Sequence, residues 1–266
     1  MAALARPMLL LLLWNGPSLS SVAASTVVDL QKRIIGGRPC KRQHHVKLRG
    51  VAAGGSSNLC GGSLISDRWI LTAAHCLNPQ RTMFAALSVH PGGSAKEVRI
   101  TAEPVIYRDK DKNNNIRPHD IMLLQLPTPS GIQPIALPDC GHRPKKVEIA
   151  GHAATTGGPN DERKPGSSPT LHCADIDVVS CKDLKNTLHQ RFQEFFKVKV
   201  YQHWFCGQTP GVDICYGDSG GGVVHKGKIY GIISFLGDPN NVCRKAAAFM
   251  DLCNPEYAAW IRKTIV

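Results

Sequence analysis

The chain has 266 residues, ten cysteines and a formal net charge of +12. This length suits one large domain or two small packed ones. The frequent glycine and proline residues and the few aromatic ones are typical of a loop-rich globular protein. The sequence has no N-glycosylation sequon, no zinc-ligand spacing of cysteine or histidine and no nucleic-acid-binding motif. We therefore expect no metal, no other cofactor and no nucleic-acid partner.

The first residues have the pattern of a secretory leader. Arg6 precedes an apolar run, Met8–Trp14, that is too short to span a bilayer, and small residues follow it. We expect a signal peptide over residues 1–24, no membrane span and a secreted, extracellular chain. In an oxidising compartment ten cysteines favour five disulfides, although their number alone does not give the pairing.

Beyond residue 33 the sequence alternates short apolar runs with turn residues. Runs such as RWILTAA, DIMLLQL and IYGIISFL favour strands, and many short strands indicate an all-β barrel or sandwich. Two stretches have helical spacing instead, residues 181–196 and the C-terminal residues 255–266. Packing against the body of the protein is the default interpretation of both.

The string CYGDSGGG, residues 215–222, places Ser219 among glycines that let the backbone turn tightly. A serine hydroxyl is a weak nucleophile and needs a nearby base, a group that orients this base, and donors for the developing oxyanion. LTAAHC supplies His75 after an apolar run, and HDIMLLQL supplies Asp120 at the start of another. Each residue alone is more often structural, so the chemistry depends on the three strings occurring together.

In the order His, Asp, Ser these strings resemble the trypsin/chymotrypsin family of serine endopeptidases, over essentially all of residues 34–266. The resemblance implies an all-β fold of two packed six-stranded antiparallel barrels with a short C-terminal helix. It implies that Ser219 is the nucleophile, that His75 is the general base and then acid, and that Asp120 orients the imidazole. The backbone N–H groups of Gly217 and Ser219 would form the oxyanion hole.

The string IIGG, preceded by QKR, resembles the activation site of the same family. The resemblance implies that residues 25–33 form a propeptide and that an activating trypsin-like protease cuts between Arg33 and Ile34. The new amine would pair with Asp218, because a buried carboxylate is costly without a cationic partner. Residues 34–266 would then be the protease domain.

The resemblance also gives a disulfide pattern that uses every cysteine. It pairs Cys40 with Cys173, Cys60 with Cys76, Cys140 with Cys253, Cys181 with Cys206, and Cys215 with Cys243. One further family bridge has neither half here, because Val147 and His225 stand at its positions.

The resemblance places Asp213 at the floor of the primary specificity pocket, where a carboxylate favours Arg or Lys before the scissile bond. Leu236 and Ala247 stand where family members usually have glycines, so we expect narrowed walls. Three outcomes remain open: a weak or selective Arg/Lys protease, a preference for smaller residues, or binding without efficient turnover. The expected pocket residues are Asp213, Ile214, Ser234, Phe235, Leu236 and Ala247.

The sequence thus predicts a secreted, zymogen-activated serine endopeptidase that cleaves after Arg or Lys. The alternative is a cationic glycan- or surface-binding protein on the same fold, because removal of residues 1–33, net +2, leaves about +10. Expected partners are protein or peptide substrates, the activating protease, anionic glycans and serpin or Kunitz-type inhibitors; we expect a monomer, with secretory granules as a candidate store. The long segment 182–200 is either an exosite or a surface helix.

Overall fold

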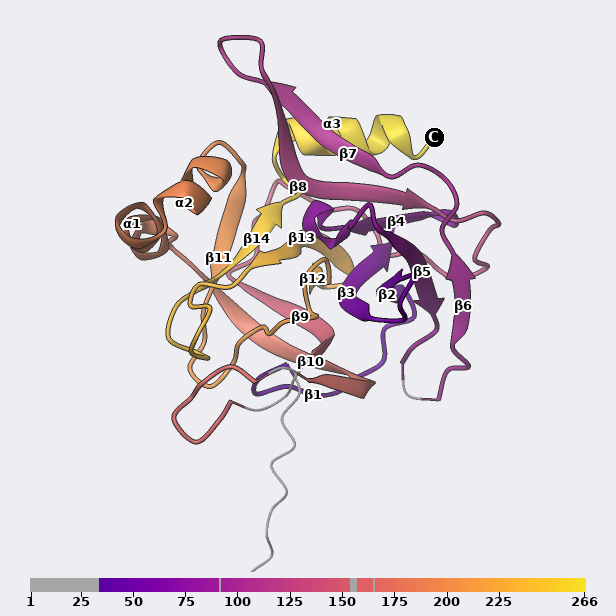
Figure 1. Cartoon of the computed structure of the whole chain (residues 1–266), viewed down its shortest axis with the longest axis horizontal. Coiled ribbons are helices and arrows are strands. Elements are labelled where there is room, and N and C mark those ends of the chain that lie inside the picture. The colour runs from indigo at the N-terminus through magenta and orange to yellow at the C-terminus, as the bar shows by residue number, and fades with distance from the viewer. Residues whose placement is uncertain (1–33, 91, 154–156, 165) are drawn as a thin grey trace, which may run out of the picture. The chain divides into compact units, whose positions relative to one another are not determined.

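The computed structural model describes residues 34–266 except residues 91, 154–156 and 165, so the expected signal peptide, the propeptide and Arg33 lie outside the described residues. Two β-sheets make up most of the described chain (Figure 1). The strands are β1 (Arg38–Pro39), β2 (His45–Ala52), β3 (Ser57–Leu64), β4 (Trp69–Thr72), β5 (Arg81–Leu87), β6 (Lys96–Arg99), β7 (Val105–Lys110), β8 (Ile116–Gln125), β9 (Lys146–Ala153), β10 (Ser167–Val179), β11 (Trp204–Gly207), β12 (Gly222–His225), β13 (Lys228–Phe235) and β14 (Ala247–Asp251). The helical elements are η1 (Ala74–Cys76), α1 (Lys182–Arg191), α2 (Gln193–Lys199) and α3 (Pro255–Thr264).

The first sheet has the antiparallel strand order β6-β5-β2-β3-β4-β8-β7. In β8 the run Ile121–Leu124 is fully buried, because the strand is covered on both faces, and this explains its unbroken apolar sequence. The core around β8 includes Val224 and Ile232 of the second sheet and Ile261 of α3. One hydrophobic core therefore joins the two sheets and positions the residues at the start of β8.

The second sheet closes on itself. Its strands follow the order β1-β10-β11-β14-β13-β12-β9, and β9 also pairs with β10, which completes a ring of six strands with β1 at its edge. The pairing of Val224 with Glu148 sets Val147 opposite His225, so the two positions of the missing family bridge are neighbours on adjacent strands. The expected all-β fold is confirmed: a closed six-stranded barrel, a second sheet and a short C-terminal helix fit two packed barrels.

Helices α1 and α2 form the expected helical segment and stand out beside β11 in Figure 1. Leu184 and Leu188 are buried against Trp204 and Phe235, which fixes α1 to the second barrel. Phe192 separates the helices because its backbone, with φ −135° and ψ 53°, leaves the helical region. The segment is packed on one side, yet Phe192 and other large apolar side chains on it remain partly exposed.

Asn254 caps the N-terminus of helix α3, and its side chain accepts hydrogen bonds from the N–H groups of Glu256 and Tyr257. Tyr257 and Ile261 are buried, and Trp260 packs against the same core, as the helical spacing predicts. The Tyr257 hydroxyl lies 2.5 Å from Nδ1 of His119, the residue before Asp120. Helix α3 therefore supports the strand that carries a candidate catalytic residue.

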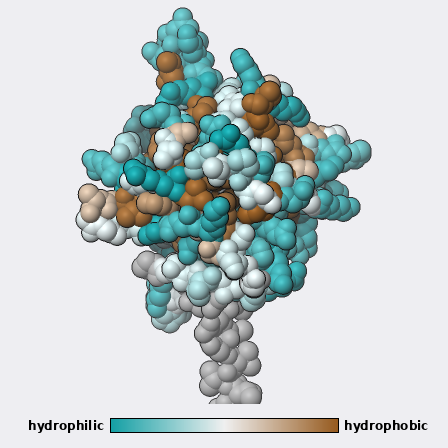
Figure 2. All heavy atoms as spheres, turned by 90° about the vertical axis from the view of Figure 1, so that its right-hand side faces the viewer, coloured by the Kyte–Doolittle hydropathy of each residue, from teal (hydrophilic) through white to brown (hydrophobic). Residues whose placement is uncertain are grey.

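Hydrophilic side chains cover most of the molecular face on the right-hand side of Figure 1, and smaller hydrophobic groups lie between them (Figure 2). Among the described residues, no helix combines the length and the apolar character that a membrane crossing requires.

Candidate active site

Strand pairing brings His75 and Asp120 together. Strand β4 pairs with β8 and sets Thr72 opposite Met122, so η1, which follows β4, lies beside the start of β8. The His75 Nδ1 atom is 2.9 Å from Oδ1 and 3.0 Å from Oδ2 of Asp120, and the His75 N–H also donates to Oδ1 at 3.0 Å. A carboxylate at Nδ1 favours the tautomer with hydrogen on Nδ1, which leaves Nε2 free to accept a proton.

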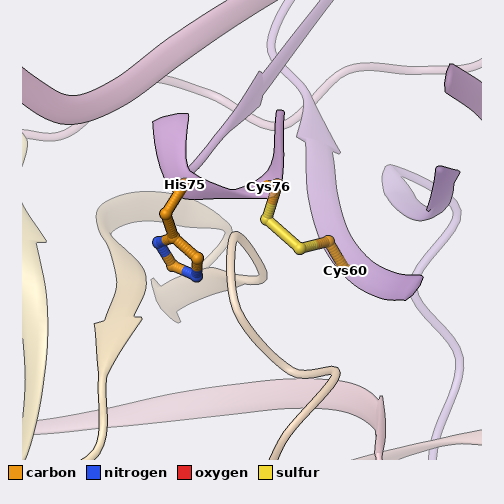
Figure 3. Close-up of side chains that lie close together, drawn as sticks. All are labelled: Cys60, His75 and Cys76. Carbon is orange, nitrogen blue, oxygen red and sulfur yellow. A yellow bond between two sulfur atoms is a disulfide. The ribbon is translucent and has the colours of Figure 1, made fainter. Parts of the chain in front are cut away.

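A disulfide holds the backbone next to His75. Cys76, on η1, is bonded to Cys60 of β3, and the imidazole lies beside this bridge (Figure 3). The imidazole nitrogen and the two sulfur atoms lie within 4.8 Å of one another, which resembles a metal-binding cluster. Because the sulfur atoms are bonded to each other, they are not thiolate ligands, so we assign the bridge a structural role.

The Asp120 carboxylate is almost completely buried, with 5% of the residue exposed. Its Oδ2 atom accepts hydrogen bonds from the Ser234 hydroxyl and from Nζ of Lys199, the latter at 2.9 Å. Burial alone would raise the pKa of Asp120, but the His75 hydrogen bond and the Lys199 charge outweigh it and hold the pKa well below the usual range. Asp120 is therefore ionised and has two charged or chargeable neighbours.

Ser219 lies in the tight turn that the glycines of CYGDSGGG predict. Gly217 and Gly220 have positive φ angles of 109° and 81°, which glycine adopts without strain. The Ser219 carbonyl accepts a 2.7 Å hydrogen bond from the N–H of Gly61 on β3, so the turn of the second barrel is tied to the first sheet. This tie brings Ser219 to the same pocket as His75.

The pocket shared by His75 and Ser219 has a volume of about 550 Å³. Its other lining residues are Leu188, Phe192, Phe195, Lys199, Tyr216, Ser234, Phe235, Leu236, Gly237 and Pro239. The expected wall residues Ser234, Phe235 and Leu236 are thus present, and α1 and α2 add an aromatic wall. Most of the lining is apolar, as in many sites that bind organic groups.

Asp213, the expected pocket floor, lies outside this lining and is buried against an arginine of the same chain. The Arg163 Nη2 atom is 2.5 Å from Oδ2 of Asp213, and both side chains are almost completely inaccessible to solvent. Arg163 also donates from Nη1 to the Ile214 carbonyl and from Nε to the Asp238 carbonyl, each at 2.6 Å. Ile214 and Ala247 are likewise buried and do not line the pocket.

Asp218 is completely buried and accepts hydrogen bonds from the backbone N–H groups of Ala153 and Cys215, at 3.0 and 2.9 Å. Burial raises the pKa of Asp218 to about 7, and these hydrogen bonds oppose the shift. Ile34 is also fully buried, in the cluster that includes Ile214, and the Ile35 carbonyl accepts from the Asp213 N–H. Residues 34–35, the start of the expected protease domain, therefore contact the segment that leads into the serine turn.

Four of the five expected disulfides are present: Cys40–Cys173, Cys60–Cys76, Cys140–Cys253 and Cys181–Cys206. The fifth expectation needs correction for this structure, because Cys215 and Cys243 are free thiols. Arg163 donates hydrogen bonds to the carbonyl of Ile214, which precedes Cys215, and to the carboxylate of Asp213. The same carboxylate accepts a hydrogen bond from the backbone N–H of Cys243. The Arg163 guanidinium thus joins the two cysteine-bearing segments in place of a bridge.

The roles of Lys199 and Arg163 were not foreseen from the sequence. Lys199 stands in the alternating run KVKV and Arg163 in the polar stretch NDERKPG, patterns that are typical of solvated surface. Their partners are 79 and 50 residues away along the chain, so no local signal reveals the pairs.

Comparison with known proteins supports the resemblance. The family model described as Trypsin matches residues 34–261. Trypsin V-A of Rattus norvegicus is 31% identical over 255 residues, which cover 93% of this chain and 95% of the relative. Kallikrein-8 of Homo sapiens is 29% identical over 247 residues, which cover 88% of this chain and 87% of the relative.

Two solved structures show the same architecture. Neuropsin, a serine protease expressed in the limbic system of mouse brain, has a TM-score of 0.65 and 26% identity, covering 86% of this chain and all but 1% of its own. An inactivated protease paralogue of the scabies mite, SMIPP-S-D1, has a TM-score of 0.67, and the match covers 87% of this chain and 97% of that chain. At 21% identity this likeness supports the fold alone.

Proposed function

Because this chain belongs to the trypsin family of serine endopeptidases, which hydrolyse peptide bonds, we propose that it works through an acyl-enzyme made by His75, Asp120 and Ser219. The observation that carries the proposal is the His75–Asp120 contact at 2.9 Å beside a pocket that His75 shares with Ser219. A substrate bound in this pocket can therefore contact both His75 and Ser219.

In the proposed mechanism Ser219 Oγ attacks the scissile carbonyl while His75 Nε2 takes its proton. Asp120 keeps the imidazole oriented and stabilises the imidazolium that forms. The backbone N–H groups of Gly217 and Ser219 bind the oxyanion of the tetrahedral intermediate. His75 then gives the proton to the leaving amine, which departs as the acyl-enzyme forms. In the second half His75 takes a proton from water, whose oxygen attacks the acyl carbon, and returns the proton to Ser219 Oγ as the ester bond breaks.

We propose further that the protein is secreted as a zymogen and that cleavage between Arg33 and Ile34 activates it. Asp218 supports this, because a buried carboxylate held by two neutral N–H donors gains most from a cationic partner. Ile34 is buried in the cluster that includes Ile214, four residues before Asp218, and this places the proposed new amine in the same region as the carboxylate. An activating protease with trypsin-like specificity is the implied partner.

Cleavage after Arg or Lys is the specificity that Asp213 supports. In the uncut chain Arg163 occupies this carboxylate, so a substrate cation must displace it before it can reach the floor of the pocket. The apolar lining that includes Phe235 and Leu236 would meanwhile accept apolar side chains. We therefore propose a protease whose selectivity for Arg or Lys depends on how readily Arg163 moves.

The test is the initial rate of the chain cleaved at Arg33–Ile34, on peptides that differ only in the residue before the scissile bond, with Ser219→Ala as control. Selective cleavage after Arg or Lys, absent in the control, supports Asp213 as an accessible floor. Cleavage after apolar residues assigns specificity to the walls. No turnover above the control, from a folded and cleaved chain, overturns the proposed activity.

The alternative is a cationic glycan- or surface-binding protein on the same fold with weak or no proteolytic turnover, which would draw on the net charge of about +10 that remains after removal of residues 1–33. Acidic glycans, and with them storage in granules, are its candidate partners, and serpin or Kunitz-type inhibitors are candidates for the protease itself. Retention on heparin that disappears near physiological salt would argue against a glycan partner.

A further inference from the structure

A buried lysine from outside the expected triad contacts the catalytic aspartate. Nζ of Lys199 lies 2.9 Å from Oδ2 of Asp120 and 3.3 Å from the hydroxyl of Ser234, and only 6% of the lysine residue is exposed. The ammonium also lies 5.6 and 5.1 Å from the ring centroids of Phe195 and Phe235. Lys199 is thus a fixed charge in a mostly apolar surrounding.

The end of α2 is attached to the same aspartate by several contacts. The Gln202 Oε1 atom accepts from the Asp120 N–H at 3.0 Å, and its Nε2 atom donates to the Val198 carbonyl at 2.7 Å. The indole N–H of Trp204 donates to the Lys199 carbonyl at 2.9 Å. These contacts fix both the backbone and the side chain of Lys199 beside Asp120, so the ion pair is a built feature of the segment 182–200.

We propose that Lys199 is a positioning residue that acts through Asp120 and sets the pH range of the catalytic histidine, an inference that rests on the proposed function. When His75 takes the serine proton it becomes a cation that shares one carboxylate with the Lys199 ammonium. Two cations on one carboxylate repel each other, so Lys199 favours the neutral imidazole. His75 therefore stays competent as a base at lower pH than it would beside Asp120 alone.

The groups that face this carboxylate come from several elements. His75 comes from η1, Lys199 from α2 and Ser234 from β13, while Gln202 contacts the backbone N–H of Asp120. Among these described contacts His75 and Lys199 are the titratable or charged groups. Replacing Lys199 by a neutral residue leaves the carboxylate to His75, and we expect the titration midpoint of the histidine to rise by about one pH unit.

The test compares Lys199→Met with Lys199→Arg, which keeps the charge, and with Lys197→Met as a matched control. Lys197 lies two residues away on α2, but its side chain is 68% exposed and pairs with Glu194 on the surface. In the full chain cleaved at Arg33–Ile34, the acidic midpoint of the kcat/KM profile should move up by about one unit in Lys199→Met and stay unchanged in both controls. An unchanged midpoint in a folded Lys199→Met enzyme overturns the proposal.

A second measurement does not depend on turnover. In the Ser219→Ala background, ¹H NMR follows the His75 ring protons against pH, with and without Lys199→Gln, which keeps a hydrogen-bond donor and loses the charge. We expect a higher midpoint with the glutamine, and equal midpoints refute the role of Lys199. If the His75 midpoint shifts but the chain that retains Ser219 has no peptidase activity, the role of Lys199 stands and the proposed function is overturned instead.

Discussion

Arg163→Met should convert the buried floor of the pocket into a binding site for basic side chains. The wild-type guanidinium makes three hydrogen bonds, to the Asp213 carboxylate and to the Ile214 and Asp238 carbonyls. Separating such a buried charged pair costs about 3 kcal/mol or more. A substrate arginine that must first displace Arg163 therefore loses roughly two orders of magnitude in kcat/KM, at about 1.4 kcal/mol for each factor of ten.

The assay is kcat/KM on two peptides that differ only in having Arg or Leu before the scissile bond. We expect Arg163→Met to raise the ratio of kcat/KM for the Arg peptide to that for the Leu peptide about 100-fold. The arginine of the substrate then supplies the positive charge that Asp213 has lost with Arg163. Lys164→Met is the matched control, because Lys164 is next to Arg163 in the sequence and the Lys164 side chain is 54% exposed. Benzamidine, a small amidinium cation, should also raise the Tm of Arg163→Met more than that of the wild type.

A ratio that stays within about twofold of the wild type in a folded, active Arg163→Met enzyme would refute this reasoning. It would mean that basic side chains do not reach Asp213 even when the internal arginine is absent. A gain that survives the additional change Asp213→Asn would also contradict it, because the gain would then not come from the carboxylate.

Three further predictions concern stability. Burial raises the pKa of Asp218 to about 7, so the folded, uncut chain binds the Asp218 proton more tightly than the unfolded chain does. The Tm of the uncut chain should therefore fall as the pH rises from about 4 to about 7. Asp218→Asn should remove this pH dependence in a pH series of thermal melts. Gly151→Ala would place a Cβ atom 1.8 Å from Oδ1 of Asp218, and we expect a loss of about 1–3 kcal/mol in urea unfolding, whereas unchanged stability would show that the turn yields easily. Asn254→Ala removes the cap of α3 and should cost about 1 kcal/mol in the same assay, with Asn254→Asp as the variant that keeps the cap.

The sequence predicted the fold and the meeting of His75, Asp120 and Ser219, but it did not predict the charged residues that lie beside them. Apolar runs such as Ile121–Leu124 identify buried strands, and the three strings around His75, Asp120 and Ser219 identify a family whose architecture brings them together. Strand pairing then does bring His75 and Asp120 into contact. The roles of the three residues stay predictions until activity is measured.

The ion pairs that modify the site could not be predicted, because they depend on how helix α2 and the segment around Arg163 pack against distant parts of the chain. A lysine among valines and an arginine in a polar loop have the same local sequence whether they face water or a carboxylate. Only the packing of α2 on β13 buries Lys199, and only the approach of residues 157–163 to residues 240–242 buries Arg163.

The link between Tyr257 and His119 has a consequence for the order of events during synthesis. These residues are 138 positions apart, and the Gly61–Ser219 tie spans a similar stretch. The strand that carries Asp120 therefore pairs early with β4 and β7 but gains the support of α3 only when much later chain has been made. The N-terminal half leaves the ribosome with His75 and Asp120 but without nucleophile, lysine or supporting helix. Such non-local contacts form late and slowly. The proposed catalytic set is therefore incomplete in the growing chain until Ser219 and the segments around it have been made.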